Sequence, residues 1–146
     1  MNTDFSFIKE RAGVHQYKLD KNGLNVLLIP NASTEVVTVM VVYHVGSRNE
    51  AVGYTGSTHF LEHLMFKGTN KFDPLKGNGL DDVLKKVGGI NNATTSYDRT
   101  NYFEVVPKNS IKLALELEAD RMRNLLLRKD ERDAEMTVVR NEFERG

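Results

Sequence analysis

Two histidines and a glutamate make up the segment of this sequence best suited to chemistry. His59 and His63 are four residues apart, so on a helix they lie one turn apart on one face, where both imidazoles can reach one ion. Zinc binds neutral imidazole well, and this spacing is typical of zinc-binding helices. Glu62 borders the same face, where a carboxylate can take a proton from a zinc-bound water as a general base. The alternative is an ordinary solvated helix face.

A third ligand is needed, because catalytic zinc usually has three protein ligands and one open position. The chain has no cysteine, and His15 and His44 lie in predicted strands, far from a helical partner. We therefore expect a carboxylate. The last predicted helix offers Glu135 and Glu142, which are seven residues apart and nearly on one face, so that one can bind the metal while the other orients a ligand. For either glutamate alone, a solvated helix face is the simpler interpretation.

Hydrophobic periodicity predicts the elements that position these residues. The predicted strands are 15–20, 24–29, 36–45, 92–96 and 101–106, and the predicted helices are 57–67, 80–87, 111–126 and 131–146. Asn22 and Gly23 form a turn that joins the first two strands as a hairpin. The near-continuous apolarity of Val36–Val45 favours a strand that is buried on both faces in the middle of a sheet.

Strands in blocks, with helices between and after them, predict the α+β fold class: a mainly antiparallel sheet with helices packed on one face. The chain has 146 residues, which is enough for one domain with a sizeable core but too few for two comfortable ones. We therefore interpret residues 1–146 as a single domain. The last helix reaches Gly146 without a terminator, and we expect the natural chain to continue.

Composition excludes several functions. Twenty basic residues balance twenty acidic ones, so there is no net charge to attract nucleic acid or an anionic membrane. No apolar run approaches the roughly 20 residues of a membrane-spanning helix, and the lack of cysteine excludes disulfides and thiolate chemistry. Residues 1–10 lack the basic and apolar regions of a signal peptide. This favours a cytoplasmic location, with the periplasm as the alternative if a signal was removed.

Five longer segments of the sequence carry a resemblance to a known family. They are Gly46–Glu50, Gly56–Thr69, Gly88–Thr95, Asp98–Tyr102 and Val138–Glu142. In this order they resemble the inverzincin zinc metallopeptidases (peptidase family M16), which carry a His-x-x-Glu-His motif and include pitrilysin, insulin-degrading enzyme and the mitochondrial processing peptidase. The resemblance implies a catalytic zinc-binding domain of the LuxS/processing-peptidase-like type, expected to be the N-terminal part of a longer peptidase.

The resemblance also implies the roles of single residues. His59, His63 and Glu142 match by position the family's ligands of one zinc ion. Glu62 matches its general base, and Glu135 matches a glutamate that supports the site. Glu144 is the fallback for the third ligand. Glu142 is favoured over it because Glu142 is in register with Glu135.

Residues 92–95 match the family's substrate-binding edge strand. Backbone hydrogen bonds hold an extended peptide at such an edge whatever its sequence, and they present the scissile carbonyl in a fixed orientation. We expect Asn92, Ala93 and Thr94 to bind substrate, with the Asn92 side chain also holding the peptide or polarising its carbonyl. The alternative is that Asn91 and Asn92 only form a turn before a strand.

The expected function is that of a zinc-dependent endopeptidase. Zinc polarises the peptide carbonyl, while Glu62 activates the attacking water and carries its proton to the leaving amine. The expected partners are a peptide or unfolded protein substrate and a homologous second domain or subunit. The alternatives are a non-catalytic peptide-binding subunit, a truncated metal-binding domain of the same fold, and a zinc hydrolase that acts on a small molecule and has no free edge strand beside its metal.

Overall fold

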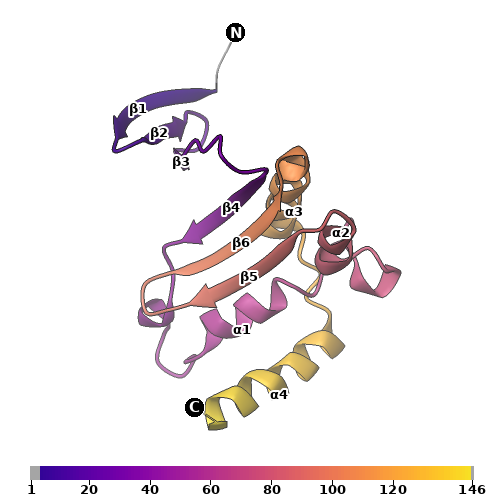
Figure 1. The fold of residues 1–146 in the computed structure, drawn as a ribbon. Helices are drawn as coiled ribbons and strands as arrows, with labels where there is room; N and C mark the ends of the chain where they lie inside the picture. Colours follow the sequence, from indigo (N-terminus) through magenta and orange to yellow (C-terminus); the bar gives the residue numbers. More distant parts are fainter. Residues whose placement is uncertain (1–3, 146) are drawn as a thin grey trace. The chain divides into compact units, whose positions relative to one another are not determined.

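The chain divides into two compact units at the connection from Glu35 to Val36. In the computed structural model, which describes residues 4–145 (Figure 1), the first unit contains strands and the second contains strands and helices. The paired strands of both units are antiparallel, which confirms the α+β fold class predicted from the sequence. The interpretation of residues 1–146 as one catalytic domain stays a prediction.

The first unit is a three-stranded antiparallel sheet in the order β1-β2-β3. Its strands are β1 (Phe5–Arg11), β2 (Val14–Leu19) and β3 (Asn25–Leu28). The predicted hairpin of β2 and β3 is confirmed. β1 is an additional strand, whose signal in the sequence is the alternation of phenylalanines. Phe7 of β1 packs edge-on against Tyr17 of β2, with ring centroids 5.4 Å apart.

The second unit contains a three-stranded sheet in the order β4-β6-β5. Its strands are β4 (Val36–Tyr43), β5 (Ile90–Thr95) and β6 (Thr100–Pro107). β6 is the central strand, and β4 and β5 pair with it from its two sides. β5 is therefore an outer strand of this sheet.

The expectation that Val36–Val45 lies in the middle of a sheet and is buried on both faces is wrong. β4 pairs only with β6 within the described part of the chain, and its residues alternate between exposed and half-buried. Val36 and Met40 are exposed, whereas Val37 and Val39 pack against the core. A valine-rich run reports that the residues fit a pleated surface, and it does not fix the place of the strand in the sheet.

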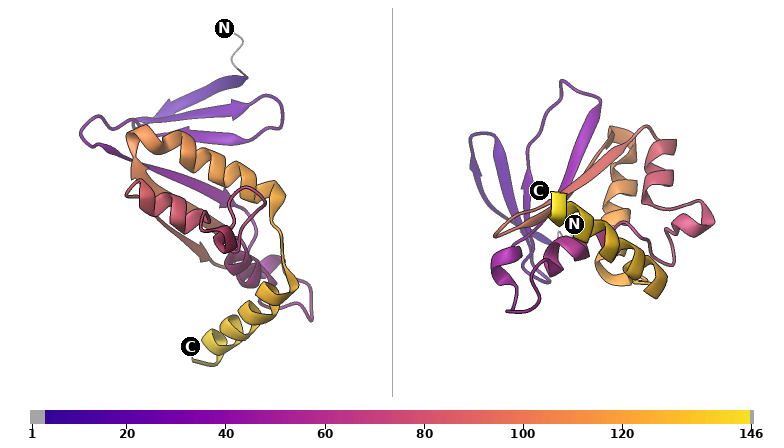
Figure 2. Two further views of the ribbon diagram at one scale, coloured as in Figure 1. Left: turned by 90° about the vertical axis from the view of Figure 1, so that its right-hand side faces the viewer. Right: turned by 90° about the horizontal axis from the view of Figure 1, so that it is seen from below.

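The second unit contains the four predicted helices, and their ends differ from the predicted ones by a few residues. They are α1 (Ser57–Leu64), α2 (Leu80–Lys86), α3 (Ile111–Asn124) and α4 (Lys129–Arg145), with the 3-10 turns η1 (Ser47–Asn49), η2 (Pro74–Lys76) and η3 (Lys108–Ser110). In Figure 2, α2 and α3 lie side by side over one face of the sheet. In residues 4–145, every helix is too short or too polar to span a bilayer.

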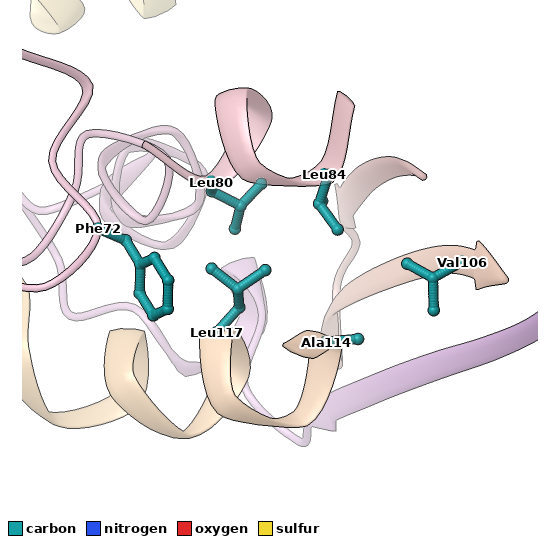
Figure 3. Close-up of a cluster of buried hydrophobic side chains, with 6 residues drawn as sticks. All are labelled: Phe72, Leu80, Leu84, Val106, Ala114 and Leu117. Carbon is teal, nitrogen blue, oxygen red and sulfur yellow. The ribbon is translucent and has the colours of Figure 1, made fainter. Parts of the chain in front are cut away.

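The main core of the second unit lies between α2, α3 and the central strand (Figure 3). Its buried apolar side chains are Phe72, Leu80, Leu84, Val106, Ala114 and Leu117. Val106 comes from β6, and the helices supply most of the others. This packing fixes the sheet against which α1 is placed.

A second buried cluster fixes α1 to the sheet. Met65, immediately after α1, packs with Ala93 of β5 and Tyr102 of β6. The guanidinium of Arg121 from α3 lies 4.5 Å from the centroid of the Tyr102 ring, within the range of a cation–π contact. α1 is thereby held beside β5, the outer strand.

Candidate metal centre

The helix α1, which carries the predicted histidines, begins at a carboxylate. Glu50 accepts hydrogen bonds from the backbone N–H groups of Gly56 and Thr58, both at 2.8 Å. The N–H groups of a first helical turn have no partner within the helix, and the helix dipole favours a negative charge there. Hydrogen bonds from the side chain and backbone of Thr58 lower the pKa of Glu50. α1 therefore has a fixed start just before His59.

Two imidazoles and a carboxylate converge beside α1. His59 Nε2 and His63 Nε2 are 3.1 Å apart, and Glu142 Oε2 of α4 is 3.7 Å from the first and 3.5 Å from the second. Tetrahedral zinc with bonds of about 2.0–2.1 Å holds its ligand atoms roughly 3.3 Å apart, so this donor set fits a zinc ion. Across the part of the chain that the structure describes, no other group of three potential metal ligands is as close, and Glu144 does not belong to this one.

Glu135 orients one of these imidazoles. Its Oε1 lies 2.8 Å from His63 Nδ1, so a proton on Nδ1 is donated to the carboxylate and Nε2 keeps its lone pair. Lys67 forms an ion pair with the other oxygen of Glu135. Burial alone would raise the pKa of Glu135, but the hydrogen bonds from Lys67 and His63 outweigh it and the pKa is lowered. Glu135 thus stays ionised.

Lys67 was not among the predicted site residues. The signal that could have found it is its place four residues after His63, on the continuation of the α1 turn: its backbone N–H donates to the carbonyl of Leu64 at 3.0 Å. Spacing alone could not identify its partner, because Glu135 lies far along the sequence.

Glu62, the predicted general base, is buried, with 9% of its surface exposed. Its Oε2 accepts a hydrogen bond from the hydroxyl of Thr95, at the end of β5. This contact joins residues far apart in the sequence, so it could not be predicted from a local sequence pattern. The carboxylate therefore lies next to the candidate ligand His63, with one oxygen already hydrogen-bonded.

The predicted substrate-binding residues lie in the outer strand β5, alongside α1 (Figure 1). The Ala93 side chain is buried, and its backbone N–H donates to Asn92 Oδ1 at 2.8 Å. The Thr94 hydroxyl donates to Asn101 Oδ1 at 2.8 Å. Asn91 and Asn92 both belong to the strand, so the alternative that they only form a turn is wrong.

A cavity of about 480 Å³ opens beside His59. It lies where η1, the start of α1 and the end of β5 meet, and its lining is rich in hydroxyl groups. The lining residues are Ser47, Glu50, Gly56, Thr58, His59, Thr95, Ser96 and Tyr97. The space next to the candidate ligand His59 is therefore open and carries hydroxyl groups on its lining.

The start of α4 is tied down by a second ion pair. Arg128, the residue before α4, places Nη2 2.6 Å from Oδ2 of the buried Asp73. The hydrogen bond from Arg128 lowers the pKa of Asp73. With the contact between Glu135 and His63, this pair sets the position of the helix that carries Glu142.

Comparisons with known proteins agree with this geometry. Residues 25–145 match the family described as insulinase (peptidase family M16), and the chain belongs to this family. It is 43% identical over 129 residues to the zinc protease PqqE of Helicobacter pylori, which covers 88% of this chain and 28% of that protein. It is 33% identical over 125 residues to the insulin-degrading enzyme of Mus musculus, which covers 86% of this chain and 12% of that protein. The resemblance predicted from the five sequence segments is confirmed.

Solved structures share the fold. The crystal structure of pitrilysin matches with a TM-score of 0.82 at 28% identity, over 97% of this chain and 16% of that chain. The crystal structure of a protease from Helicobacter pylori matches with a TM-score of 0.76 at 36% identity, over 94% of this chain and 30% of that chain. The chain thus spans less than a third of the length of these relatives. Membership of a family of proteases supports a peptidase role in general.

Proposed function

We propose that this chain is the zinc-binding catalytic part of an endopeptidase. The observation that carries the proposal is the approach of His59 Nε2, His63 Nε2 and Glu142 Oε2 to within 3.1–3.7 Å of one another. These separations suit tetrahedral zinc. When bound, zinc acidifies water and polarises a carbonyl.

Two carboxylates of the chain divide the work in this proposal, one for proton transfer and one for orienting a ligand. Glu62 takes a proton from the attacking water and returns it to the leaving amine. His63 gives its Nδ1 hydrogen bond to Glu135 at 2.8 Å, which keeps the imidazole in the orientation and tautomer that a ligand needs. The roles divide between a buried base and an orienting carboxylate on another helix.

Peptide binding is proposed at the outer edge of β5. Within residues 4–145 this strand pairs with β6 on one side only, so an extended peptide can add to its other side through main-chain hydrogen bonds. The residues that would meet it are Asn92, Ala93 and Thr94. A small-molecule zinc hydrolase has no need of such an edge beside its ligands, and the edge therefore favours a peptide or an unfolded protein as substrate.

A homologous second domain or subunit is proposed to complete the site. The chain spans 28% of the Helicobacter pylori relative and 12% of the mouse one. The side chains of His59 and Glu142 are 41% and 50% exposed, so these two proposed ligands are open to solvent, whereas that of His63 is 18% exposed. A further part of the protein has room to cover them and to exclude water during the reaction.

The decisive experiment replaces the base without changing its size. In the full-length natural protein, Glu62→Gln is expected to keep one zinc per chain and to lower peptide turnover by about 100-fold or more, because the amide cannot take a proton. Zinc is measured by elemental analysis, and turnover with a fluorogenic peptide. The matched control is Glu116→Gln, at an exposed glutamate of α3, which is expected to leave both quantities unchanged.

Two results would contradict the proposal. One is wild-type protein that binds no zinc, and the other is Glu62→Gln protein that hydrolyses the peptide at the wild-type rate. Wild-type protein that binds zinc and peptide without turnover would instead support the non-catalytic peptide-binding subunit.

A further inference from the structure

The hydroxyl of Thr95 is the group that engages the buried carboxylate of Glu62. Thr95 ends β5 and is paired in register with Thr100 of β6. Its Oγ1 donates to Glu62 Oε2. Within the described residues, this hydroxyl is the hydrogen-bond partner found for the Glu62 side chain, which has no ion pair there.

The direction of this hydrogen bond follows from its neighbours. Thr100 Oγ1 donates to the backbone carbonyl of Val45 at 3.0 Å, and a carbonyl can only accept. The single proton of Thr100 is thus committed, although its oxygen is 3.4 Å from that of Thr95. That proton is therefore not shared with Thr95, and the Thr95 hydroxyl donates its own proton to Glu62 Oε2.

A held oxygen matters because a glutamate side chain has several rotatable bonds. Glu62 loses rotamer freedom when it is fixed, and a group engaged in proton transfer must lie within hydrogen-bond reach of the reacting atoms. With Oε2 engaged by Thr95, the other oxygen, Oε1, is left for that transfer. Removal of the hydroxyl would leave a buried carboxylate oxygen without a partner.

We infer that Thr95 is a positioning residue that holds the Glu62 carboxylate ready for proton transfer. The inference rests on the function proposed above. Because Thr95 belongs to β5, the strand proposed to pair with the peptide also carries the group that orients the base. A shift of this strand would therefore move both partners of the reaction together.

The test compares three substitutions in the full-length natural protein. Thr95→Val keeps the shape of the side chain and removes the hydroxyl, whereas Thr95→Ser keeps the hydroxyl. Thr38→Val is the matched control, since Thr38 lies exposed on β4 in the same sheet. Each protein is assayed for zinc content and for kcat and KM with a fluorogenic peptide.

Thr95→Val is expected to bind one zinc and to lower kcat by about 10- to 100-fold, the scale of a misplaced catalytic group, with KM within about twofold. Thr95→Ser is expected to recover kcat to within about threefold of wild type, and Thr38→Val to match wild type. If Thr95→Val does not fold, as judged by its melting curve, Thr95→Ala takes its place with the same expectations.

The inference is overturned if Thr95→Val keeps the wild-type kcat, or if Thr95→Ser is as impaired as Thr95→Val. Failure of the proposed function looks different, because there Glu62→Gln itself would retain turnover. A wild-type kcat in Thr95→Val beside an inactive Glu62→Gln would reject only the role of Thr95.

Discussion

The two helices that carry the proposed ligands are held in the molecule in different ways. α1 ends in apolar packing: Leu64 and Met65 are buried, and Met65 contacts Tyr102 of the central strand. α4 is seventeen residues long, and Glu135 is its one buried residue in the described range. The imidazoles thus stand on a helix fixed by the hydrophobic core, whereas Glu142 stands on a helix fixed by polar contacts.

This difference indicates which half of the site is sensitive to the loss of charged groups. Apolar packing does not depend on charge, so the pair of histidines is prearranged by the fold. The contacts of α4, Arg128 with Asp73 at 2.6 Å and Glu135 with His63 at 2.8 Å, depend on ionised groups. Loss of charge at the groups that make these contacts, or at Glu142 itself, should therefore weaken the site without unfolding the sheet, whereas loss of charge elsewhere on α4 should not.

The largest effect is expected from the ligand on α4. Glu142→Gln should weaken zinc binding by more than about 100-fold, which is above the range seen when groups outside the ligand set are changed, because a neutral amide replaces a charged ligand. Glu144→Gln, two residues further along the same helix, should leave the affinity unchanged. Both are measured by zinc titration against a chelating dye. Equal effects of the two substitutions would contradict this expectation, since they would mean that zinc affinity depends on the charge of α4 and not on the position of the carboxylate.

A smaller effect is expected from the orienting carboxylate. Glu135→Gln should weaken zinc binding by about 10- to 100-fold, because the amide holds His63 less firmly and leaves Lys67 without its ion pair. The same titration measures it, with Glu116→Gln as the surface control. A zinc affinity equal to that of wild type would show that Glu142 is the only residue of α4 that contributes to zinc binding.

The smallest effect is expected from the anchor at the start of α4. Arg128→Met should lower the melting temperature by about 1–3 °C at pH 7, as for a partly exposed ion pair. The lowered pKa of Asp73 means that the pair stabilises the fold above the ordinary pKa of aspartate, about 4, and that this stabilisation is lost as the pH falls through the lowered value. The difference between variant and wild type should vanish in acid. Melting curves across pH check this, and a difference that persists in acid would assign it to packing of the arginine stem.

The sequence could predict the parts of this site that are local. His59, Glu62 and His63 follow from helical spacing, and the carboxylates at 135 and 142 follow from a shared helix face together with the family resemblance. Their approach to one another could not be derived from periodicity, because it depends on how α4 is turned and on where Arg128 places its start. Spacing within each helix is a short-range property, whereas the angle between helices is set by contacts distant in sequence.

The errors and omissions have the same origin. The run at Val36–Val45 was rightly predicted as a strand, but its place in the sheet depends on β6, which comes much later in the chain. The hydrogen bond from Thr95 to Glu62 and the ion pair from Lys67 to Glu135 also join separate segments. In each case the sequence shows the type of side chain, but it does not show which distant residue that side chain contacts.

The sparse apolar anchorage of α4 has a thermodynamic consequence. A cation that binds to all three ligands fastens α4 to α1, so part of its binding free energy becomes docking free energy for that helix. The link between α3 and α4 gives this docking a fixed base, because Leu125 forms a β-bridge with Thr69 and the Leu126 N–H donates to the Gly68 carbonyl at 3.2 Å.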